Sequence, residues 1–549
     1  MKKLVIFFLI LSSLIFGATF YGNLHSHTSY SDGKGTPDEA YEYAKQFLDV
    51  LAVTDHAYYF AQKIDGKTKP YLTKLAAERH TKDGEFVALQ GFEWTAGVGH
   101  INVYESIEWI DRNQEGSLEG FYAWLVKHKK LAQFNHPISK FGTFDSFRYF
   151  PEADKYVNLI EVGNGNWSSG DVINPEMFGN YILALNRGWH LGATANQDNH
   201  KPNWGSANDA RTGIIADKLT YDAIMDALWK RHTFGSEDRN VQVLFKSGEH
   251  LMGDVVFIDD FSQKTLSIEY KDTEKLLYLA LISQSGTVLE LRPGTDHLKL
   301  DLKVTPPDGY EWYFFYMKQM DGDEIVTSPI WFQIPSPVYV NSVRISPEEI
   351  HAGEVAKLYF EIYNTTENKA KVNLIILLDD DPIRNVTQEF APYQLKRFVV
   401  PTGKLEEGTH RISFLVNGKL VQSISFVVQE KLKGVIMIDT LHENDHLEEL
   451  RALAEELKKA GYNVIYPKVM LKNLGGIDIL IIATPKEGGL SFAKKLSKKE
   501  LEELEKFEGK LYIIPGGDEE YREIYLSQLK GEVVTLEELR KRLLGEGDS

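Results

Sequence analysis

Five short apolar runs near the start of the chain each end in a His, Asp or Glu side chain. The runs have the length of buried parallel strands, and the segments between them, such as Thr36–Phe47 and Ser117–Lys129, have the apolar spacing of amphipathic helices. This alternation predicts βαβ units, in which the carboxyl ends of the strands meet on one face. The polar side chains should therefore gather there. The runs are Tyr21–His27, Val50–His56, Phe86–Glu93, Lys130–His136 and Gly192–His200.

Two of these runs end in a pair of polar side chains two residues apart. His25 is paired with His27 in this way, and Asp198 with His200. Side chains at this spacing project from the same side of an extended strand. Each pair can therefore reach a single cluster, which favours a metal site built from several strands.

Further carboxylates and imidazoles accompany these pairs. Asp32 lies in a loop after the first pair, and His100 follows Glu93 across the Gly-rich turn Ala96–Gly99. Because the chain contains no cysteine, a bound metal must take imidazole and carboxylate ligands, which suits zinc, manganese or iron. Nine such groups are too many for one ion, so we expect two or three metals with Glu93 as a bridge. The nine are His25, His27, Asp32, His56, Glu93, His100, His136, Asp198 and His200.

In this order the motifs resemble those of the PHP (polymerase and histidinol phosphatase) metallohydrolases, over roughly residues 20–240. The matching stretches are His25-x-His27 with Ser31–Gly33, Thr54–His56, Gly91–Glu93, His100, Asn135–Pro137 and Asp198-x-His200. The resemblance implies a distorted seven-stranded (β/α) barrel with a trinuclear metal centre. Many relatives have His where this chain has Asp32, which implies a third site that is weaker or has a different metal preference. The resemblance assigns one metal to His25, His27, Glu93 and Asp198, a second to Glu93, His100 and His136, and a third to Asp32, His56 and His200.

A closer resemblance is to the carbaryl-hydrolase-like (CehA/McbA-like) branch of that family. It is carried by Ala210–Ala216, Leu219–Leu228 and Arg231–Gly235, which are similar to the end of the branch's catalytic domain. The resemblance places Arg211 near the metals, where it can hold an anionic substrate group. The alternative for Arg211 is an ordinary structural role.

Other polar residues are expected to support the ligands. Asp55 should orient His56, because metal-bound imidazoles usually donate their other N–H to a carboxylate or carbonyl. Glu161, Asn164 and Asn196 end or follow strand-like runs on the same face and are candidates for contacts to the ligands or to substrate. Isolated histidines are more often core residues than ligands, and we expect this of His80, His128, His190 and His232.

The length and charge of the chain set the surroundings of this site. A chain of 549 residues should contain several domains, and its formal net charge of -18 argues against a general nucleic-acid or anionic-membrane partner. Residues 1–18 have a short basic start and an apolar core too short for a typical transmembrane helix, which predicts a secretory signal peptide. We therefore expect a secreted, periplasmic or cell-surface protein of a bacterium or archaeon. Retention of the segment as a membrane tether is the alternative.

The alternation of strands and helices stops after about residue 240, where the predicted PHP barrel (19–240) ends. Short strands separated by Gly, Pro and Asp predict a β-sandwich over 241–335 and an immunoglobulin-like β-sandwich over 338–430. Strand and helix alternate again over 434–549, which predicts a doubly wound α/β domain. This last segment is similar in outline to noncatalytic glutamine-amidotransferase-like domains, and it lacks their nucleophile because the chain has no cysteine.

The ligand set predicts hydrolytic chemistry. A metal cluster lowers the pKa of a bridging water, supplies hydroxide at neutral pH and neutralises charge on a phosphoryl or carbonyl oxygen. We therefore predict a secreted metal-dependent phosphoesterase acting on a small ester substrate, with accessory domains that attach to a surface or polymer. Two alternatives stay open: a carbamate, carboxylic ester or amide hydrolase, and a cell-surface binding protein with a degenerate metal site.

Overall fold

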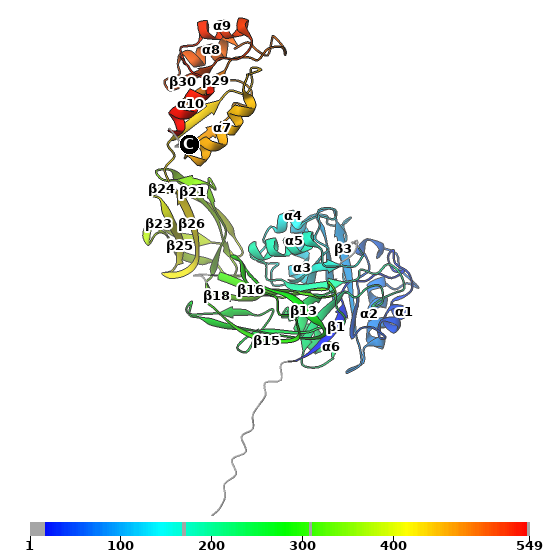
Figure 1. The fold of residues 1–549 in the computed structure, drawn as a ribbon. Coiled ribbons are helices and arrows are strands. Elements are labelled where there is room, and N and C mark those ends of the chain that lie inside the picture. Colours follow the sequence, from blue (N-terminus) through cyan, green and yellow to red (C-terminus); the bar gives the residue numbers. More distant parts are fainter. Residues whose placement is uncertain (1–16, 167–171, 307–309, 546–549) are drawn as a thin grey trace, which may run out of the picture. The chain divides into compact units, whose positions relative to one another are not determined.

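A computed structural model describes residues 17–166, 172–306 and 310–545 (Figure 1). The chain divides into two compact units. The first contains the chain up to Arg344 together with Tyr359–Val399 and Arg411–Ile424, and the second contains Ile345–Leu358, Val400–His410 and the chain from Ser425 onward. The predicted signal peptide lies outside the described residues as far as residue 16, and Ala18 is the first residue of strand β1.

The amino-terminal part of the first unit alternates strands with helices. Its strands are β1 (Ala18–Asn23), β2 (Val50–Val53), β3 (Val87–Ala96), β4 (Gly99–Tyr104), β5 (Ala132–Asn135), β6 (Val157–Asn164), β7 (Gly192–Asn196), β8 (Arg211–Ala216) and β9 (Thr233–Ser236). Its helices are α1 (Pro37–Ala44), η1 (Ala57–Tyr59), α2 (Lys69–His80), α3 (Leu118–His128), α4 (Phe144–Phe147), α5 (Pro175–Asn186) and α6 (Tyr221–Trp229).

Local signals set the helix boundaries that the sequence predicts. The Thr36 side chain accepts a hydrogen bond from the Glu39 N–H in a capping box, and Pro37 occupies the first turn of α1. Ser117 caps α3 in the same way, by accepting from the Gly120 N–H. Helix α1 then buries Tyr41 against β2 and β3, so the strands keep an apolar outer face.

Strands β1 to β7 pair one after another, and the continuation of β7 is joined back to that of β1. Pairs β1–β2, β2–β3, β5–β6 and β6–β7 are parallel, and an isolated parallel bridge between Ser26 and Asn199 joins the continuations of β1 and β7. Strand β4, which the apolar runs do not predict, pairs antiparallel with β3 and β5. The predicted series of parallel strands is therefore interrupted by a hairpin. Gly99 begins β4 at φ +146°, where an added Cβ would lie 2.1 Å from the Phe144 ring.

Residues 242–333 continue the first unit as β strands. These strands are β10 (Gln242–Ser247), β11 (His250–Leu251), β12 (Val255–Phe257), β13 (Lys264–Ser283), β14 (Gly286–Leu291), β15 (Thr295–Val304), β16 (Tyr310–Gln319), β17 (Glu324–Thr327) and β18 (Ile330–Gln333). The apolar runs Thr265–Tyr270 and Leu276–Ile282 both belong to the single strand β13, whose pairing with β15 shifts register between Lys271 and Leu276.

The predicted boundary at residue 240 does not interrupt the sheet or the core. Strand β17 pairs antiparallel with β9 through Ile325 and Ser236. Trp312 and Trp331 of the β segment belong to the same hydrophobic cluster as Trp94 and Phe134 of the preceding part. The two segments thus stabilise one another through shared buried apolar surface.

One buried carboxyl in this segment predicts a pH-dependent stability. Burial raises the pKa of Glu311 to about 7, although the Gln284 N–H donates to its carboxylate at 2.6 Å. The folded state therefore holds a proton that the unfolded state releases above about pH 4.5, so stability falls as pH rises from there to about 7. Glu311→Gln should raise the free energy of unfolding at pH 8 by about 2–3 kcal/mol and leave it unchanged at pH 4. Thermal melts at both pH values, with the exposed Glu290→Gln as control, test this. An equal effect at both pH values would contradict it.

Residues 338–429 are built of strands, as the sequence predicts. They are β19 (Val338–Ser346), β20 (Ile350–His351), β21 (Val355–Asn364), β22 (Ala370–Leu378), β23 (Asp381–Phe390), β24 (Leu395–Lys404), β25 (Gly408–Val416) and β26 (Lys419–Gln429). Strand β22 pairs antiparallel with β23 and with β25. The division between the two compact units falls within this segment.

The carboxyl-terminal part of the second unit has the alternation of a doubly wound domain. It contains β27 (Gly434–Ile438), α7 (Leu447–Lys459), β28 (Tyr462–Ile465), β29 (Ile479–Ala483), α8 (Lys498–Glu505), β30 (Lys510–Ile514), α9 (Glu519–Gln528), β31 (Glu532–Val533) and α10 (Leu536–Leu544). The parallel strand order is β28-β27-β29-β30-β31. Ile481 packs with α7 and α10, whereas its neighbour Ile482 packs with α8 and α9, so helices cover both faces.

His442, which follows β27 and precedes α7, is buried. Its Nδ1 lies 2.8 Å from Asp439 Oδ2 and its Nε2 lies 3.3 Å from Glu500 Oε1. The imidazole is thus held between two carboxylates, and its role in this domain is structural.

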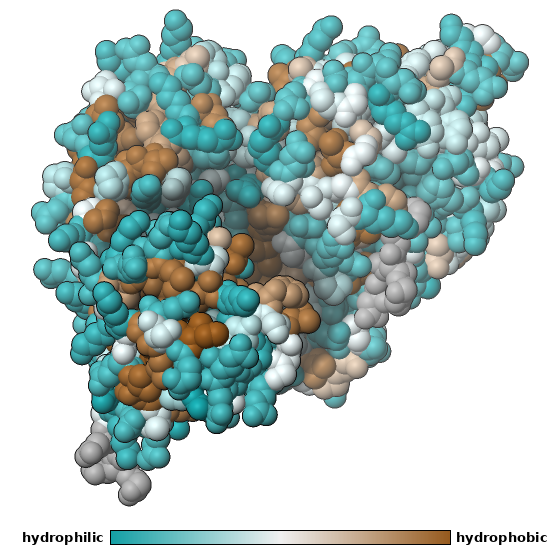
Figure 2. Space-filling view, turned by 90° about the horizontal axis from the view of Figure 1, so that it is seen from above, coloured by the Kyte–Doolittle hydropathy of each residue, from teal (hydrophilic) through white to brown (hydrophobic). Residues whose placement is uncertain are grey.

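The described surface agrees with the acidic, hydrophilic composition. Figure 2 shows a face on which hydrophilic side chains predominate and hydrophobic ones lie in small groups. No described helix is long and apolar enough to cross a membrane.

Candidate metal centre

Two pairs of polar side chains lie side by side at the ends of β1 and β7. The His27 N–H donates to the Asn199 carbonyl at 2.8 Å, and the Asp198 N–H donates to the His25 carbonyl at 3.0 Å. These backbone bonds join the two strand continuations. His27 Nε2 consequently lies 3.0 Å from Asp198 Oδ1.

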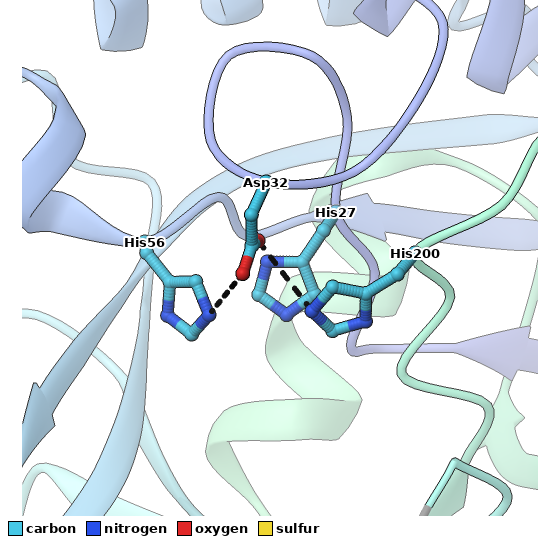
Figure 3. Close-up of side chains that lie close together, drawn as sticks. All are labelled: His27, Asp32, His56 and His200. Atoms are coloured by element: carbon cyan, nitrogen blue, oxygen red, sulfur yellow. Dashed lines mark ion pairs between the residues drawn. The ribbon is translucent and has the colours of Figure 1, made fainter.

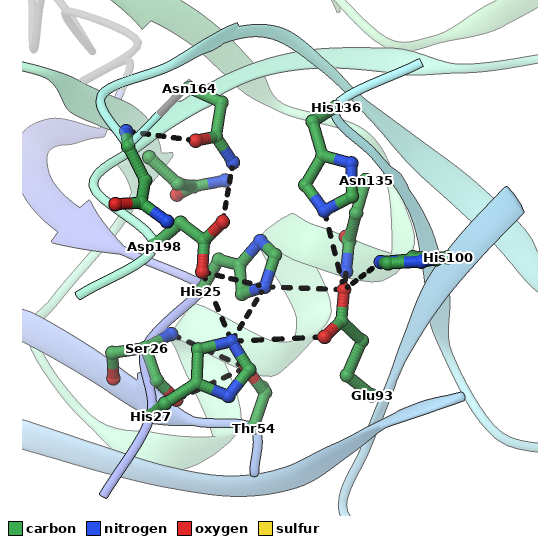
Figure 4. Close-up of polar contacts among 12 residues, drawn as sticks. His25, Ser26, His27, Thr54, Glu93, His100, Asn135, His136, Asn164 and Asp198 are labelled. Carbon is green, nitrogen blue, oxygen red and sulfur yellow. Dashed lines mark hydrogen bonds and ion pairs between the residues drawn. The ribbon is translucent and has the colours of Figure 1, made fainter. Parts of the chain in front are cut away.

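Glu93 lies at the centre of the cluster, on β3, and only 1 % of its side chain is exposed (Figure 4). The hairpin to β4 brings His100 to the carboxylate, and an isolated bridge between His56 and Glu93 brings the end of β2 there. Oε1 lies 3.3 Å from His100 Nδ1, 3.4 Å from His136 Nε2 and 3.5 Å from His25 Nε2. Oε2 lies 2.6 Å from His56 Nδ1 and 3.7 Å from His27 Nε2.

A second group lies on the solvent side of the cluster (Figure 3). Asp32 Oδ2 is 3.7 Å from His56 Nε2, and Asp32 Oδ1 is 3.5 Å from His200 Nε2. The Asp32 side chain is 37 % exposed, in contrast to Glu93. A substrate can therefore approach the cluster on the side of Asp32.

Contacts outside the cluster fix which imidazole nitrogen points inward. His25 Nδ1 lies 2.9 Å from Glu161 Oε1, and His200 Nδ1 lies 3.0 Å from the Asp198 carbonyl. When Nδ1 donates to these acceptors, the Nε2 lone pair of each imidazole faces the cluster. This is how proteins orient metal-binding histidines. Glu161 also accepts from the His136 N–H at 2.6 Å, so it contacts two of the expected ligands.

The charge balance of the cluster favours ionised carboxylates. Burial favours the neutral form of Glu93, but the imidazoles of His56, His25 and His100 hold the pKa of its carboxyl well below the usual range. Burial acts on Asp198 in the same direction, and His25 and His27 likewise hold its pKa well below the usual range. Two buried anions thus face several nitrogen donors, a ligand set that suits divalent transition ions.

The nine residues expected as ligands all fall into groups that can hold a metal ion. The donor atoms within each group lie within 4.8 Å of one another. Two groups match or extend expected sets, since Glu93, His100 and His136 form one and Asp32, His56 and His200 are joined by His27. The remaining groups are His25 with His27 and Glu93, and His25 with His136 and Asp198. The donor set therefore fits a polynuclear centre.

Asp55 was expected to orient His56, but its carboxylate contacts the loop that follows His27. Its carboxylate accepts from the Thr28 N–H at 2.7 Å, the Thr28 hydroxyl at 2.6 Å and the Ser31 hydroxyl at 2.5 Å. His56 instead has its Nδ1 2.7 Å from the Thr95 hydroxyl. Asp55 thus holds the loop that leads from His27 to Asp32.

Arg211 is buried, with 1 % of the residue exposed. Its guanidinium donates to the carbonyls of Gly205 and Ala210, each at 2.7 Å, and to that of Asn208 at 3.1 Å. Of the two roles considered for Arg211, these contacts favour the structural one. Burial lowers the pKa of Arg211 to about 10, so the guanidinium remains charged at neutral pH.

Tyr58 and Arg112 lie beside the cluster but belong to none of the sequence motifs described above. The Tyr58 ring stacks on that of His56 with centroids 5.1 Å apart. The Arg112 guanidinium lies 4.0 Å from the Tyr58 ring centroid. Arg112 is exposed and forms no ion pair with a carboxylate among the described residues. An exposed cation thus lies against the aromatic ring that stacks on His56.

The isolated histidines have structural partners, as expected. His80 Nε2 lies 3.1 Å from Asp38, His190 Nδ1 lies 2.8 Å from Asp154, and His232 Nε2 lies 2.9 Å from Asp254. His128 Nδ1 lies 2.7 Å from the Trp124 carbonyl. They are not part of the metal-binding groups found in the described residues.

No family model matches the chain, and no curated protein matches it. Among solved structures, it is similar to a two-domain protein from Bacteroides vulgatus containing a predicted PHP-like metal-dependent phosphoesterase, with 17 % identity and a TM-score of 0.34 over 55 % of this chain and 96 % of that one. It is also similar to elastase-activated alpha-2-macroglobulin of Escherichia coli, with 10 % identity and a TM-score of 0.24 over 41 % and 25 % of the two chains. Fibronectin(III)-like modules of Clostridium thermocellum CbhA give 14 % identity and a TM-score of 0.13 over 34 % and 94 %. At scores this low, none of these similarities supports a conclusion about fold or function.

Proposed function

We propose that this chain is a metal-dependent hydrolase of the PHP type, with a trinuclear centre, that cleaves phosphoric esters. The observation that carries the proposal is that all nine expected ligands fall into four overlapping groups of donors, two of which share the buried carboxylate of Glu93. The Nε2 atoms of His25 and His27 lie 3.2 Å apart, and they lie 3.5 Å and 3.7 Å from the Glu93 carboxylate, so one ion can contact all three residues. Divalent ions held by these residues would supply an activated water and neutralise charge on the substrate's oxygens.

The surroundings of the cluster favour an anionic substrate. Asp32 and His200 form its exposed side, Tyr58 stacks on His56, and Arg112 lies over the Tyr58 ring. A guanidinium can make two parallel hydrogen bonds to phosphate, and its neighbouring aromatic ring restricts its position. We infer that Arg112 holds the phosphoryl group, whereas Arg211 fixes the backbone of the 205–210 loop.

Arg112→Ala should reduce kcat/KM for a phosphomonoester about 10- to 100-fold, because a charge-assisted contact to the substrate is lost. The effect on a neutral carbamate should be less than about three-fold, since that substrate presents no charged oxygen. Purified protein with manganese or zinc is assayed against p-nitrophenyl phosphate, bis(p-nitrophenyl) phosphate and naphthyl methylcarbamate. Arg292→Ala is the matched control, because Arg292 also lies over a tyrosine ring, that of Tyr278, at 5.6 Å.

The same assay separates the alternatives. Preferential carbamate hydrolysis that does not depend on Arg112 would favour the carbamate, ester or amide hydrolase. Inactivity on all three substrates at full metal occupancy would favour the cell-surface binding protein. Secretion and attachment to a surface or polymer remain parts of the proposal, and they concern the amino-terminal segment and the accessory domains.

A further inference from the structure

A cavity of about 440 Å³ lies in the first compact unit, away from the metal ligands. Its lining includes Gly188 and His190, which precede β7, whereas Asp198 and His200 follow the same strand. A strand of five residues spans about 16 Å. The cavity and the candidate metal centre therefore lie toward opposite ends of β7 and constitute separate sites.

The charged side chains of the cavity form hydrogen bonds to protein groups. The Asp154 carboxylate accepts from the Tyr149 hydroxyl at 3.1 Å and from the His190 N–H at 2.9 Å, and it lies 2.8 Å from His190 Nδ1. Lys155 Nζ donates to the Tyr393 hydroxyl at 3.0 Å. Asp154 is thus enclosed by its donors, whereas the exposed Lys155 remains a cation at the cavity. The rest of the lining is uncharged, which favours a neutral ligand with hydroxyl groups.

Two buried amides face this cavity without protein partners. Gln333 of β18 is 5 % exposed and Gln422 of β26 is 8 % exposed, and both line the cavity. Neither side-chain amide forms a hydrogen bond within the described part of the chain, although each offers donors and an acceptor. Their amide atoms are open to the cavity, where water or a ligand can satisfy them.

Aromatic rings supply the rest of the lining. Tyr149, Tyr339 and Tyr363 contribute to the walls, and Phe257 of β12 is 60 % exposed. Aromatic faces pack against the C–H face of a ring ligand, while amides donate to and accept from hydroxyl groups. We propose that this cavity binds a neutral oligosaccharide. Such binding would hold the protein on a glycan, and it does not depend on the hydrolytic function proposed for the metal centre.

The experiment measures binding of maltotetraose, cellotetraose and xylotetraose to the full chain by isothermal titration calorimetry. At least one should bind with a Kd below about 1 mM. Gln333→Leu and Gln422→Leu should each weaken that binding about ten-fold or more, because each removes hydrogen bonds to the ligand. Neither substitution should lower the melting temperature, because a partnerless amide is replaced by an apolar side chain of similar size. Gln263→Leu, at an exposed glutamine of the same unit, is the control and should change neither quantity.

Two results would overturn the proposal. One is the absence of binding by all three tetrasaccharides at about 10 mM, an affinity too weak for a dedicated site. The other is binding that Gln333→Leu and Gln422→Leu leave unchanged while both variants melt like the wild type. Phe257→Ala gives an independent check, because loss of this exposed ring should weaken binding without disturbing the core.

Discussion

Glu93→Gln is expected to reduce kcat/KM at least about 10³-fold, the largest effect of any single substitution considered. The carboxylate contacts five imidazoles, and the amide keeps its size while removing its charge. The loss should come from weaker metal binding at the groups that share Glu93. Packing should change little, since Gln fills the same volume.

Activity, metal content and melting temperature of this variant are measured together. Glu311→Gln is the matched control, because Glu311 is equally buried but belongs to β16 and has no contact with the cluster. It should retain full activity and metal content. Full activity in Glu93→Gln would show that the ligands are assigned incorrectly.

Removal of the metals is expected to abolish hydrolysis and to destabilise the first compact unit. Ions that bind only the folded state stabilise it by about 4 kcal/mol per site at a thousand times Kd. Their loss would leave Glu93 and Asp198 buried without their cations, so the melting temperature of this unit should fall by about 5–15 °C. The carboxyl-terminal α/β domain contributes none of the ligands, and its unfolding should not change. Dialysis against a chelator, followed by calorimetry and activity assays, measures both effects.

The sequence predicts the parts of the fold that local chemistry determines. Thr36 and Ser117 cap their helices through hydrogen bonds to residues three positions ahead, so the boundaries of α1 and α3 can be identified from a few neighbouring letters. The grouping of the candidate ligands could be predicted for a related reason. His, Asp and Glu at the ends of successive apolar runs have few functions other than binding metal.

Contacts between distant segments could not be predicted in this way. Asp55 precedes His56 in the chain, but its carboxylate binds Thr28 and Ser31 because the loop after β1 folds toward it. Arg211 is enclosed by carbonyls of the 205–210 loop, and no pattern of residue types indicates the course of that loop. Strand β4 was missed because Gly99–Tyr104 is too short and mixed to have a clear period.

The same limit applies to Arg112 and to the amides of the cavity. Arg112 lies more than fifty positions from Tyr58 in sequence, and an exposed arginine has no sequence signal that distinguishes it. Gln333 and Gln422 lie in strands whose sequences contain no functional motif. Only their burial without partners indicates a ligand, and burial depends on the whole fold.

Titration of the metal-free protein with manganese or zinc tests the central claim most directly. Activity and bound metal are followed as ions are added to the full chain in known amounts. The nine converging ligands predict that activity returns and reaches its plateau at two to three bound ions per chain. A plateau at one ion, or no specific binding, would contradict a polynuclear centre at Glu93.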